Sequence, residues 1–561
     1  MKRMCAFLAC VILVLGCVAA NSAEQSNTAS KEDLKVFSIL KEELKRSMSE
    51  LVAKGSIKPY FISYTLLDSD IGTVDSSYGA LYGSTRLNAR KILIEIRVGN
   101  YAYDNTDINN PMARKISSFV PVEHDEDSLK KDLWYQTNLA YEYAVKLYYY
   151  KKQQLSDEPK KETNVDSFSH ESPAVYYDKV INYDFDVPKI ERELKNASKF
   201  FRKYPQIQFD VVKCNFGAEK RYFVNSEGSE IFSSSALVDL SINARTQADD
   251  GTELSHSAAL YYDLEFQPVN FKDLEKQIKT VAEELLALKN APTVAPQTGP
   301  AILSPQAVGV LFHEAIGHRL EGERQESKDE GQTFKKSLNQ KVIPEFLNVY
   351  DDPTQFKFLN AYLNGFYRFD DEGIKAQRVD LIENGILKNF LMSRTPIEGF
   401  NKSNGHGRAN MDFSPIARMS NLFVKSSKEY DSSKLKKLLL NECKRQKKPY
   451  GFIIESMMGG ETQTLVGSFQ VFKSVPQMIY RVDANTGKEE LVRGMEIVGT
   501  PLSSVNKIIL TGNDYEVKNG YCSAESGWVR VATIAPSALI SEIELQNKRT
   551  VKKQLPIISR P

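Results

Sequence analysis

The feature that most constrains this chain is a pair of histidines, His313 and His318, at the end of a short predicted helix. The whole sequence holds six histidines, so two of them this close together form an informative pattern. Ser304 suits a helix N-cap and Pro305 suits the first helical position, so we expect a helix to begin there. The apolar residues that follow predict that it continues to the histidines, which therefore lie near its end.

The spacing of the two histidines requires an irregular backbone if both are to bind one ion. Residues five apart on a regular α-helix are separated by about 140°, whereas residues four apart are separated by about 40°. Gly317 tolerates a π-bulge or a helix ending that turns His318 to the side of His313. The sequence therefore predicts a departure from the α-helix between the two histidines.

Residue types around this pair predict hydrolytic metal chemistry. Glu314 follows the first histidine, where a carboxylate can take a proton from a water polarised by Zn²⁺. The alternative is that both histidines pack against or cap the helix end. A catalytic zinc site has three protein ligands and an open position. Spacing alone leaves the third ligand open among Cys522, His406, Glu321 and Glu323.

Several further motifs follow the histidine pair along the chain. His313 to His318 is followed by Arg319-Leu320-Glu321-Gly322-Glu323, and the segments Pro415 to Asn421 and Gly512 to Asp514 come later. Together they resemble the TldD/PmbA family of metallopeptidases, whose active members carry His-Glu-Ala-x-Gly-His and then x-Leu-Glu-Gly-acid. The resemblance extends from Ser304 to Ala535.

The resemblance implies a zinc-dependent peptidase that hydrolyses unfolded peptides. It implies that Zn²⁺ is held by His313, His318 and Cys522, and that Glu314 is the general base. It also implies a dimer, of like or unlike chains, that encloses the active site in a chamber. The alternatives are a non-catalytic peptide-binding subunit of a TldD/PmbA-type peptidase complex and a protein with a purely structural or stored zinc.

Substrate-binding residues are expected in the same C-terminal half. Arg408 and Arg418 are candidates to steady the substrate backbone or an oxyanion, with structural ion pairing as the alternative for each. Glycines allow a substrate backbone to approach closely, so Gly459 and Gly460 are further candidates. His406 departs from the family pattern, and we interpret it as a pocket or surface histidine. Gln463 stands where the family carries an acidic residue.

The remainder of the chain predicts an α+β protein with two domains. Helical periodicity over 34–51, 129–152 and 274–288, with alternating runs over 91–98 and 208–212, predicts a mixed α/β domain over 24–291. Proline and glycine punctuate 292–305, which marks the expected boundary. Residues 292–561 are predicted to form a β-rich antiparallel domain that carries the zinc-motif helix, with a hairpin at Asn384-Gly385.

The first residues predict export. Lys2 and Arg3 precede an apolar run and then small residues, which is typical of a signal peptide over 1–23. Val14-Leu15-Gly16-Cys17 also resembles a lipobox, which would end the signal at 16 and leave Cys17 lipidated. We therefore expect a periplasmic protein or a lipid-anchored envelope protein.

The charge balance and the cysteine count limit which binding partners and which thiol roles are expected. The 73 Lys and Arg nearly balance the 72 Asp and Glu, so the formal net charge is +1 and binding to nucleic acid is disfavoured. A membrane contact is expected only through the lipid anchor. Beyond the signal segment the chain has three cysteines, Cys214, Cys443 and Cys522, and an odd number in an exported protein favours a role for one thiol other than pairing.

Overall fold

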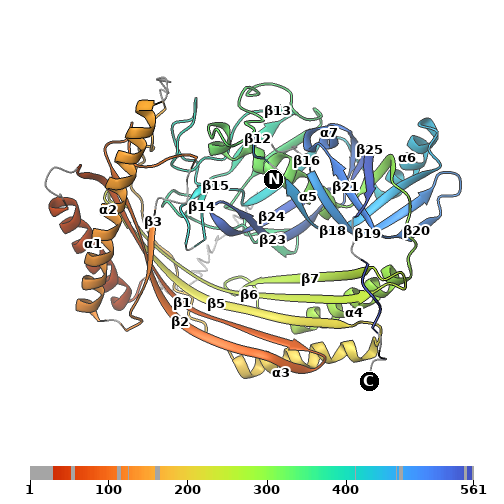
Figure 1. The fold of residues 1–561 in the computed structure, drawn as a ribbon, viewed down its shortest axis with the longest axis horizontal. Helices are drawn as coiled ribbons and strands as arrows, with labels where there is room; N and C mark the ends of the chain where they lie inside the picture. The colour runs from red at the N-terminus through yellow and green to blue at the C-terminus, as the bar shows by residue number, and fades with distance from the viewer. Residues whose placement is uncertain are drawn as a thin grey trace, which may run out of the picture.

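A computed structural model describes residues 29–51, 57–109, 115–123, 125–157, 165–410, 412–462, 464–466, 472–548, 552–556 and 558. Helices and strands are mixed along the chain in an α+β fold, as predicted (Figure 1). The predicted signal segment and Gln463 lie outside the described residues. No helix of the described part is long and apolar enough to cross a membrane.

The N-terminal half is built on one long, curved, largely antiparallel sheet. Its strand order is β3-β2-β1-β5-β6-β4, and β7 pairs with β6. In Figure 1 this sheet runs beneath the C-terminal half, with α1 and α2 against one end of it. The elements are α1 (Lys31–Glu50), β1 (Pro59–Ser77), β2 (Ala80–Val98), β3 (Lys115–Val120), α2 (Glu126–Asp157), β4 (Val175–Tyr177), α3 (Val187–Ser198), β5 (Phe209–Asn225), β6 (Glu230–Gln247), β7 (Glu253–Asp263) and α4 (Phe271–Asn290).

The helices of this half follow from capping and apolar periodicity. Ser30 and Asp33 form a reciprocal capping box at the start of α1, which satisfies backbone donors that a helix N-terminus leaves free. Asn270 caps α4, whose apolar face packs on β6 and β7. That face consists of Leu274, Ile278, Val281, Leu285 and Leu288, all buried, so the helix predicted from their spacing is confirmed.

The C-terminal half contains two larger sheets with a buried helix between them. One sheet has the order β17-β22-β25-β21-β19-β18-β8, with β20 beside β19, and the other has the order β13-β12-β9-β16-β24-β23. The strands are β8 (Gln297–Leu303), β9 (Leu347–Asp351), β12 (Val379–Glu383), β13 (Ile386–Leu387), β16 (Asn421–Ser426), β17 (Glu429–Tyr430), β18 (Tyr450–Thr462), β19 (Phe472–Asp483), β20 (Glu489–Val492), β21 (Met495–Gly499), β22 (Ile508–Gly512), β23 (Glu516–Ala524), β24 (Gly527–Ala535) and β25 (Ala538–Asn547).

The helix between these sheets is α5 (Pro305–Phe312), which contacts β18 on one side and β23 and β24 on the other. Two further helices are α6 (Ser432–Arg445), which contacts β8, and α7 (Pro501–Asn506), which contacts α5. Two short strand pairs, β10 (Lys357–Phe358) with β11 (Ala361–Tyr362) and β14 (Gly407–Arg408) with β15 (Ile416–Ala417), complete the half.

Two sequence predictions for this half concern the Asn384-Gly385 hairpin and the proline-rich segment over 292–305. Asn384 and Gly385 both adopt positive φ, at 48° and 76°, in the turn that joins β12 to β13, so the predicted hairpin is confirmed. The proline-rich segment over 292–305 contains β8, which pairs with both β18 and β25. The division of the chain into domains at residue 291 stays a prediction.

Candidate metal centre

The helix that carries the histidines changes its winding where they begin. Ser304 caps α5 by accepting a hydrogen bond from the Ala307 amide, as expected of an N-cap. The α-helix ends at Phe312, a π-turn η3 (His313–Gly317) follows, and a 3₁₀ turn η4 (His318–Leu320) comes after it. The predicted departure from the α-helix between the two histidines is therefore confirmed.

Gly317 is needed for space more than for conformation. Its φ of −55° and ψ of −58° are open to any residue. An ideal Cβ at this position would lie 1.9 Å from Met419 Sδ, and Met419 is itself buried. The wider π-turn therefore packs directly on Met419, and a larger residue at 317 would force one of them to move.

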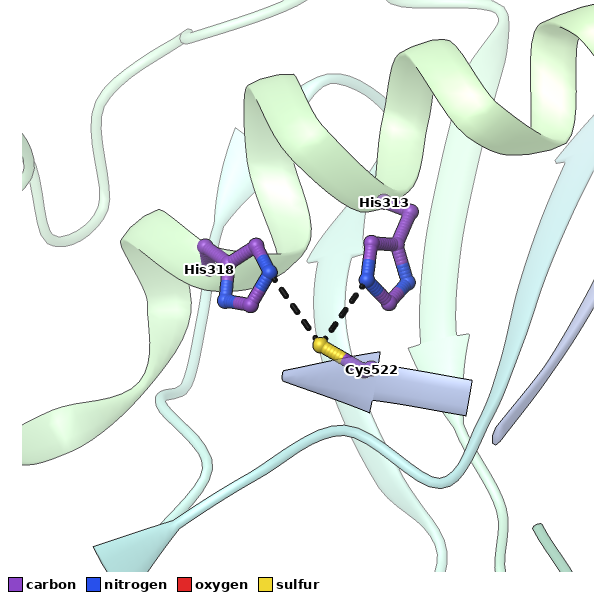
Figure 2. Close-up of side chains that lie close together, drawn as sticks. All are labelled: His313, His318 and Cys522. Atoms are coloured by element: carbon purple, nitrogen blue, oxygen red, sulfur yellow. Dashed lines mark hydrogen bonds between the residues drawn. The ribbon is translucent and has the colours of Figure 1, made fainter. Parts of the chain in front are cut away.

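The π-turn brings both imidazoles to one thiol from a distant strand (Figure 2). His313 Nε2 lies 3.2 Å from Cys522 Sγ, and His318 Nε2 lies 3.3 Å from the same sulfur. The three possible ligand atoms all lie within 4.8 Å of one another, and all three side chains are buried. Among the described residues, these three form the one cluster of His, Cys, Asp or Glu with this spacing.

The donor set fits a zinc ion. Two imidazole nitrogens and one thiolate are common zinc ligands, and Zn–N and Zn–S bonds of about 2.1 and 2.3 Å place tetrahedral N and S ligands about 3.6 Å apart. The separations from each Nε2 to Sγ are only slightly shorter than this. Three protein ligands would leave one position of a tetrahedral ion open, which is the arrangement of catalytic rather than structural sites.

Electrostatics at the centre favour a thiolate facing positive charge. Burial raises the pKa of Cys522, but the charges of His318 and His313 outweigh burial and hold that pKa well below its ordinary value. Burial lowers the pKa of each histidine, yet the Cys522 thiolate raises both above their ordinary value. The centre therefore stabilises a buried thiolate by placing positive charge beside it, which a metal cation also does.

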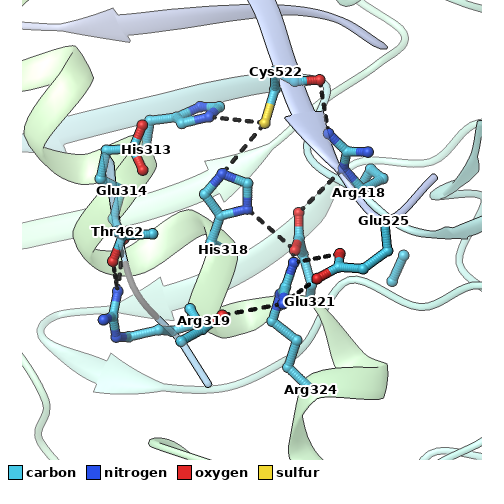
Figure 3. Close-up of polar contacts among 12 residues, drawn as sticks. His313, Glu314, His318, Arg319, Glu321, Arg324, Arg418, Thr462, Cys522 and Glu525 are labelled. Atoms are coloured by element: carbon cyan, nitrogen blue, oxygen red, sulfur yellow. Dashed lines mark hydrogen bonds and ion pairs between the residues drawn. The ribbon is translucent and has the colours of Figure 1, made fainter. Parts of the chain in front are cut away.

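Glu321 contacts the ring nitrogen of His318 that does not face Cys522. Its Oε2 lies 3.2 Å from His318 Nδ1 and accepts from Arg324 Nε at 2.7 Å, while Oε1 faces Arg418 Nε at 3.6 Å (Figure 3). Burial raises the pKa of Glu321, but the charges of His318 and Arg324 lower it to about 2 overall. A carboxylate on the far nitrogen fixes the tautomer and orientation of a histidine ligand. Glu321 is therefore placed to position His318 rather than to join the ligands.

The other candidates for the third ligand lie elsewhere. Glu323 accepts from the Ala417 amide at 3.1 Å and from the Ser393 hydroxyl. His406 is fully buried, with Nε2 lying 3.2 Å from Asp351 Oδ1 and Nδ1 lying 3.0 Å from Asn404 Oδ1. The interpretation of His406 as a pocket or surface histidine is wrong, because these two partners hold it in the interior.

The two arginine candidates are buried and donate to backbone carbonyls. Arg418 donates to the Cys522 carbonyl at 2.8 Å and to the Ser526 hydroxyl at 2.7 Å. Arg408 donates to the Met419 carbonyl at 2.7 Å. Neither side chain lines the cavity described next. Arg418 thus supports the strand that presents Cys522.

A cavity of about 1610 Å³ opens onto the centre. The N-terminal half lines it with residues of β6, β7 and α4, and the C-terminal half with residues of α5, β18 and β23. His313, Glu314 and His318 lie in its wall, as do Gly459 and Gly460. An ideal Cβ on Gly460 would lie 2.3 Å from Glu314 Cγ, so only glycine lets β18 pass this close to that carboxylate.

Two features of the site, the contact of Glu321 with His318 and the cavity wall, were missed by the sequence analysis. Sequence reasoning named Glu321 as a possible ligand and missed its contact with His318, although it lies three residues after His318, a spacing that brings side chains together on a helical turn. The cavity wall formed by β7 and α4 has no local signal, because it depends on how the two halves pack.

The C-terminal half of the chain matches a known family of domains. Residues 296–547 match the PmbA/TldA metallopeptidase C-terminal domain. The chain is 30% identical over 315 residues to a metalloprotease of Methanocaldococcus jannaschii, covering 56% of this chain and 64% of that protein. It is 29% identical over 379 residues to the zinc metalloprotease TldD homolog of Saccharolobus solfataricus, covering 64% and 77%. The chain thus spans less than two thirds of the length of the first of these relatives.

Two solved structures share the fold. One is described as a candidate modulator of a DNA gyrase from Thermotoga maritima, with a TM-score of 0.62, 18% identity, and coverage of 91% of this chain and 100% of that chain. The other is TldE from Thermococcus kodakarensis, with a TM-score of 0.58, 14% identity, and coverage of 87% and 97%. At these identities the structures establish the fold alone.

Proposed function

Because this chain is a member of the TldD/PmbA family, we propose that it is a zinc-dependent peptidase that hydrolyses unfolded peptides. The observation that carries the proposal is the convergence of His313, His318 and Cys522, within 4.8 Å of one another, at the wall of a cavity large enough for a peptide. A structural zinc would be closed to solvent by a fourth protein ligand, and the described residues offer no such ligand here.

Each residue has a distinct role in the proposal. His313, His318 and Cys522 would hold the ion, and Glu314 would act as general base. When bound, Zn²⁺ would supply Lewis acidity that acidifies a water and polarises the scissile carbonyl. Glu314 takes the proton from the attacking water and passes it to the leaving amine, which is the role its position beside His313 and at the cavity wall supports.

Substrate would bind as an extended strand along β18. One edge of β18 pairs with β19 along most of its length, whereas the other edge pairs with β8 only from Phe452 to Ile454. Along the later residues of β18, which include Gly459 and Gly460, that edge has no partner strand among the described residues, and Gly460 lies beside Glu314. Main-chain hydrogen bonding to such an edge tolerates many peptide sequences.

Partner and location form part of the same proposal. We include a dimer of like or unlike chains, supported by the similarity to TldE, which is related to this chain in fold. We also include export to the periplasm or attachment to the envelope through Cys17, supported by the sequence of residues 1–23.

The test of the proposed mechanism is Glu314→Gln, with cleavage of an unstructured peptide and zinc content measured on the same sample. The variant keeps its zinc and loses roughly a hundredfold or more of kcat, because a general base contributes about 10²–10⁴. Glu283→Gln is the matched control and keeps wild-type activity, since Glu283 is exposed on α4 and does not line the cavity.

Two results would contradict the proposal. Full activity in zinc-loaded Glu314→Gln would remove Glu314 from the mechanism. Zinc-loaded wild-type protein that binds unstructured peptides but cleaves none would instead favour the non-catalytic subunit.

A further inference from the structure

The cavity contains one positive charge that no carboxylate matches. Among its described lining residues, Arg324 and Lys518 are the Lys and Arg side chains. Arg324 is neutralised by carboxylates, donating to Glu321 at 2.7 Å and to Glu525 at 2.9 Å. Lys518, on β23, forms no ion pair with any described residue. Its Nζ donates to the Met457 carbonyl at 3.2 Å.

This lysine is held in a partly desolvated position. The side chain is half-buried, and burial lowers the pKa of its ammonium group. An ammonium group has three hydrogen-bond donors, and the Met457 carbonyl takes one of them. Removing a charge from water without a counter-charge is unfavourable, so a charge of this kind is suited to an anionic ligand.

A hydroxyl without a hydrogen-bond partner among the described residues projects from the strand next to Lys518. Thr533, on β24, is the register partner of Lys518, so both side chains project from the same face of the sheet. Thr533 is 6% exposed and lines the cavity, and its Oγ1 has no hydrogen-bond partner in the described part of the chain. An ammonium group and a hydroxyl donor together match the two oxygens of a carboxylate.

The position of Lys518 relative to the metal centre fits an extended peptide. Lys518, Gly520 and Cys522 alternate along one face of β23, and Gly520 leaves the strip between the other two without a side chain. Four residues of strand span about 13 Å. On β18, Met457 precedes Gly460 by three residues, with an irregularity in the strand pairing between them, and Gly460 adjoins Glu314. Both strands therefore separate the ammonium group from the reacting centre by about three or four peptide residues.

The rest of the cavity disfavours a carboxylate. Its other charged lining groups include Glu284 on α4 and Glu455 on β18. Glu516 precedes Lys518 by two residues on the same face of β23 and forms no ion pair with it. A negatively charged ligand group is repelled at those positions and attracted at Lys518.

We propose that Lys518, with Thr533, binds a carboxylate of the peptide substrate and sets the cleavage position three or four residues from it. The inference rests on the proposed peptidase function. The carboxylate has two sources, the C-terminus of the peptide or an Asp or Glu side chain within it.

The test compares one unstructured peptide without acidic residues in three forms: a free C-terminal acid, a C-terminal amide, and amides with a single Glu moved along the sequence. Zinc-loaded wild-type protein, Lys518→Met and Lys518→Arg are assayed by mass spectrometry for kcat/KM and cleavage position. Wild-type protein prefers a carboxylate-bearing form by on the order of ten- to a hundredfold, as expected for a charge-assisted hydrogen bond. In Lys518→Met this ratio falls to about one, and Lys518→Arg restores most of it.

The control is Lys488→Met, which removes a lysine from the exposed turn between β19 and β20 and retains the wild-type ratio. Preference for the free acid identifies the C-terminus, and preference for a Glu-bearing amide identifies a side chain. Equal cleavage of all forms by wild-type protein overturns the inference and leaves the peptidase function standing, as does a preference that persists in Lys518→Met. If zinc-loaded wild-type protein cleaves no form at all, the proposed function itself fails.

Discussion

At the scale of single residues, buried charges determine how the candidate centre is held. Three side chains that resemble ligands in the sequence, a thiol, a carboxylate and an imidazole, have different partners in the fold. Cys522 lies beside both histidines, Glu321 lies behind one of them, and His406 is bonded to Asp351. Spacing predicted the pair His313 and His318, but only the family resemblance indicated Cys522. A ligand 204 residues from His318 leaves no periodic signal, because its approach depends on strand pairing.

Replacement of Glu321 by Gln tests the positioning role at this scale. The amide cannot stabilise a protonated or metal-bound His318 as a carboxylate does, so zinc affinity falls by about 10–100-fold. Competition with a chromogenic chelator measures this affinity. The exposed Glu345→Gln serves as the control and keeps wild-type affinity. Unchanged affinity in Glu321→Gln would show that the carboxylate is only part of the ion-pair network with Arg324.

At the scale of elements, the π-turn is what allows histidines five residues apart to converge. The sequence indicated that the helix had to depart from regularity at Gly317, and this is confirmed. The reason differs from the one expected, because Gly317 has ordinary helical dihedrals and lacks a side chain where Met419 packs. Local rules predicted caps, the Asn384-Gly385 hairpin and the apolar helices. They could not predict a contact with a residue a hundred positions away.

Gly317→Ala tests this packing. The added methyl group meets Met419 Sδ in a buried site, and overpacking of this kind costs about 1–3 kcal/mol of unfolding free energy. Urea unfolding measures the loss, and zinc content reports whether His318 has moved. Gly83→Ala is the control, since a Cβ there meets nothing within 4 Å.

The same substitution in a Met419→Ala background isolates the contact. If Gly317 is required because of Met419, the cost of Gly317→Ala shrinks when Met419 is shortened. An equal cost in both backgrounds would assign the requirement to the backbone of the π-turn instead.

At the scale of the whole molecule, two features lie where the two halves meet: the cavity, and the buried carboxyl groups of Asp370 and Glu372. The sequence predicted the α+β class and most strands, but the cavity walls come from β7 and α4 of one half and β18 and β23 of the other. No local pattern encodes that packing. Near the same junction, Arg394 donates its amide to Glu372 at 2.6 Å and its guanidinium group to Glu227 of the N-terminal half.

This junction predicts a pH-dependent stability. Burial and then the charge of Asp370 raise the pKa of Glu372 above its ordinary value of 4.5, with Glu95 adding to the rise and Arg394 opposing it. The folded state therefore holds a proton that the unfolded state releases, so unfolding free energy decreases as the pH rises from 4.5 towards the raised pKa. Urea unfolding across this range shows a shallower decrease in Glu372→Gln than in wild type. The exposed Glu283→Gln keeps the wild-type slope. An identical slope in Glu372→Gln would mean that Glu372 is ionised in the folded state.

The central claim is that His313, His318 and Cys522 form a single zinc site. The most direct measurement is the zinc content of purified protein after dialysis, determined by mass spectrometry for wild type, Cys522→Ala and Glu314→Gln. The account predicts about one zinc ion per chain in wild type and in Glu314→Gln, and a large loss in Cys522→Ala, because three protein ligands are needed to retain the ion. Wild-type protein that retains no zinc, or Cys522→Ala that retains as much as wild type, would contradict it.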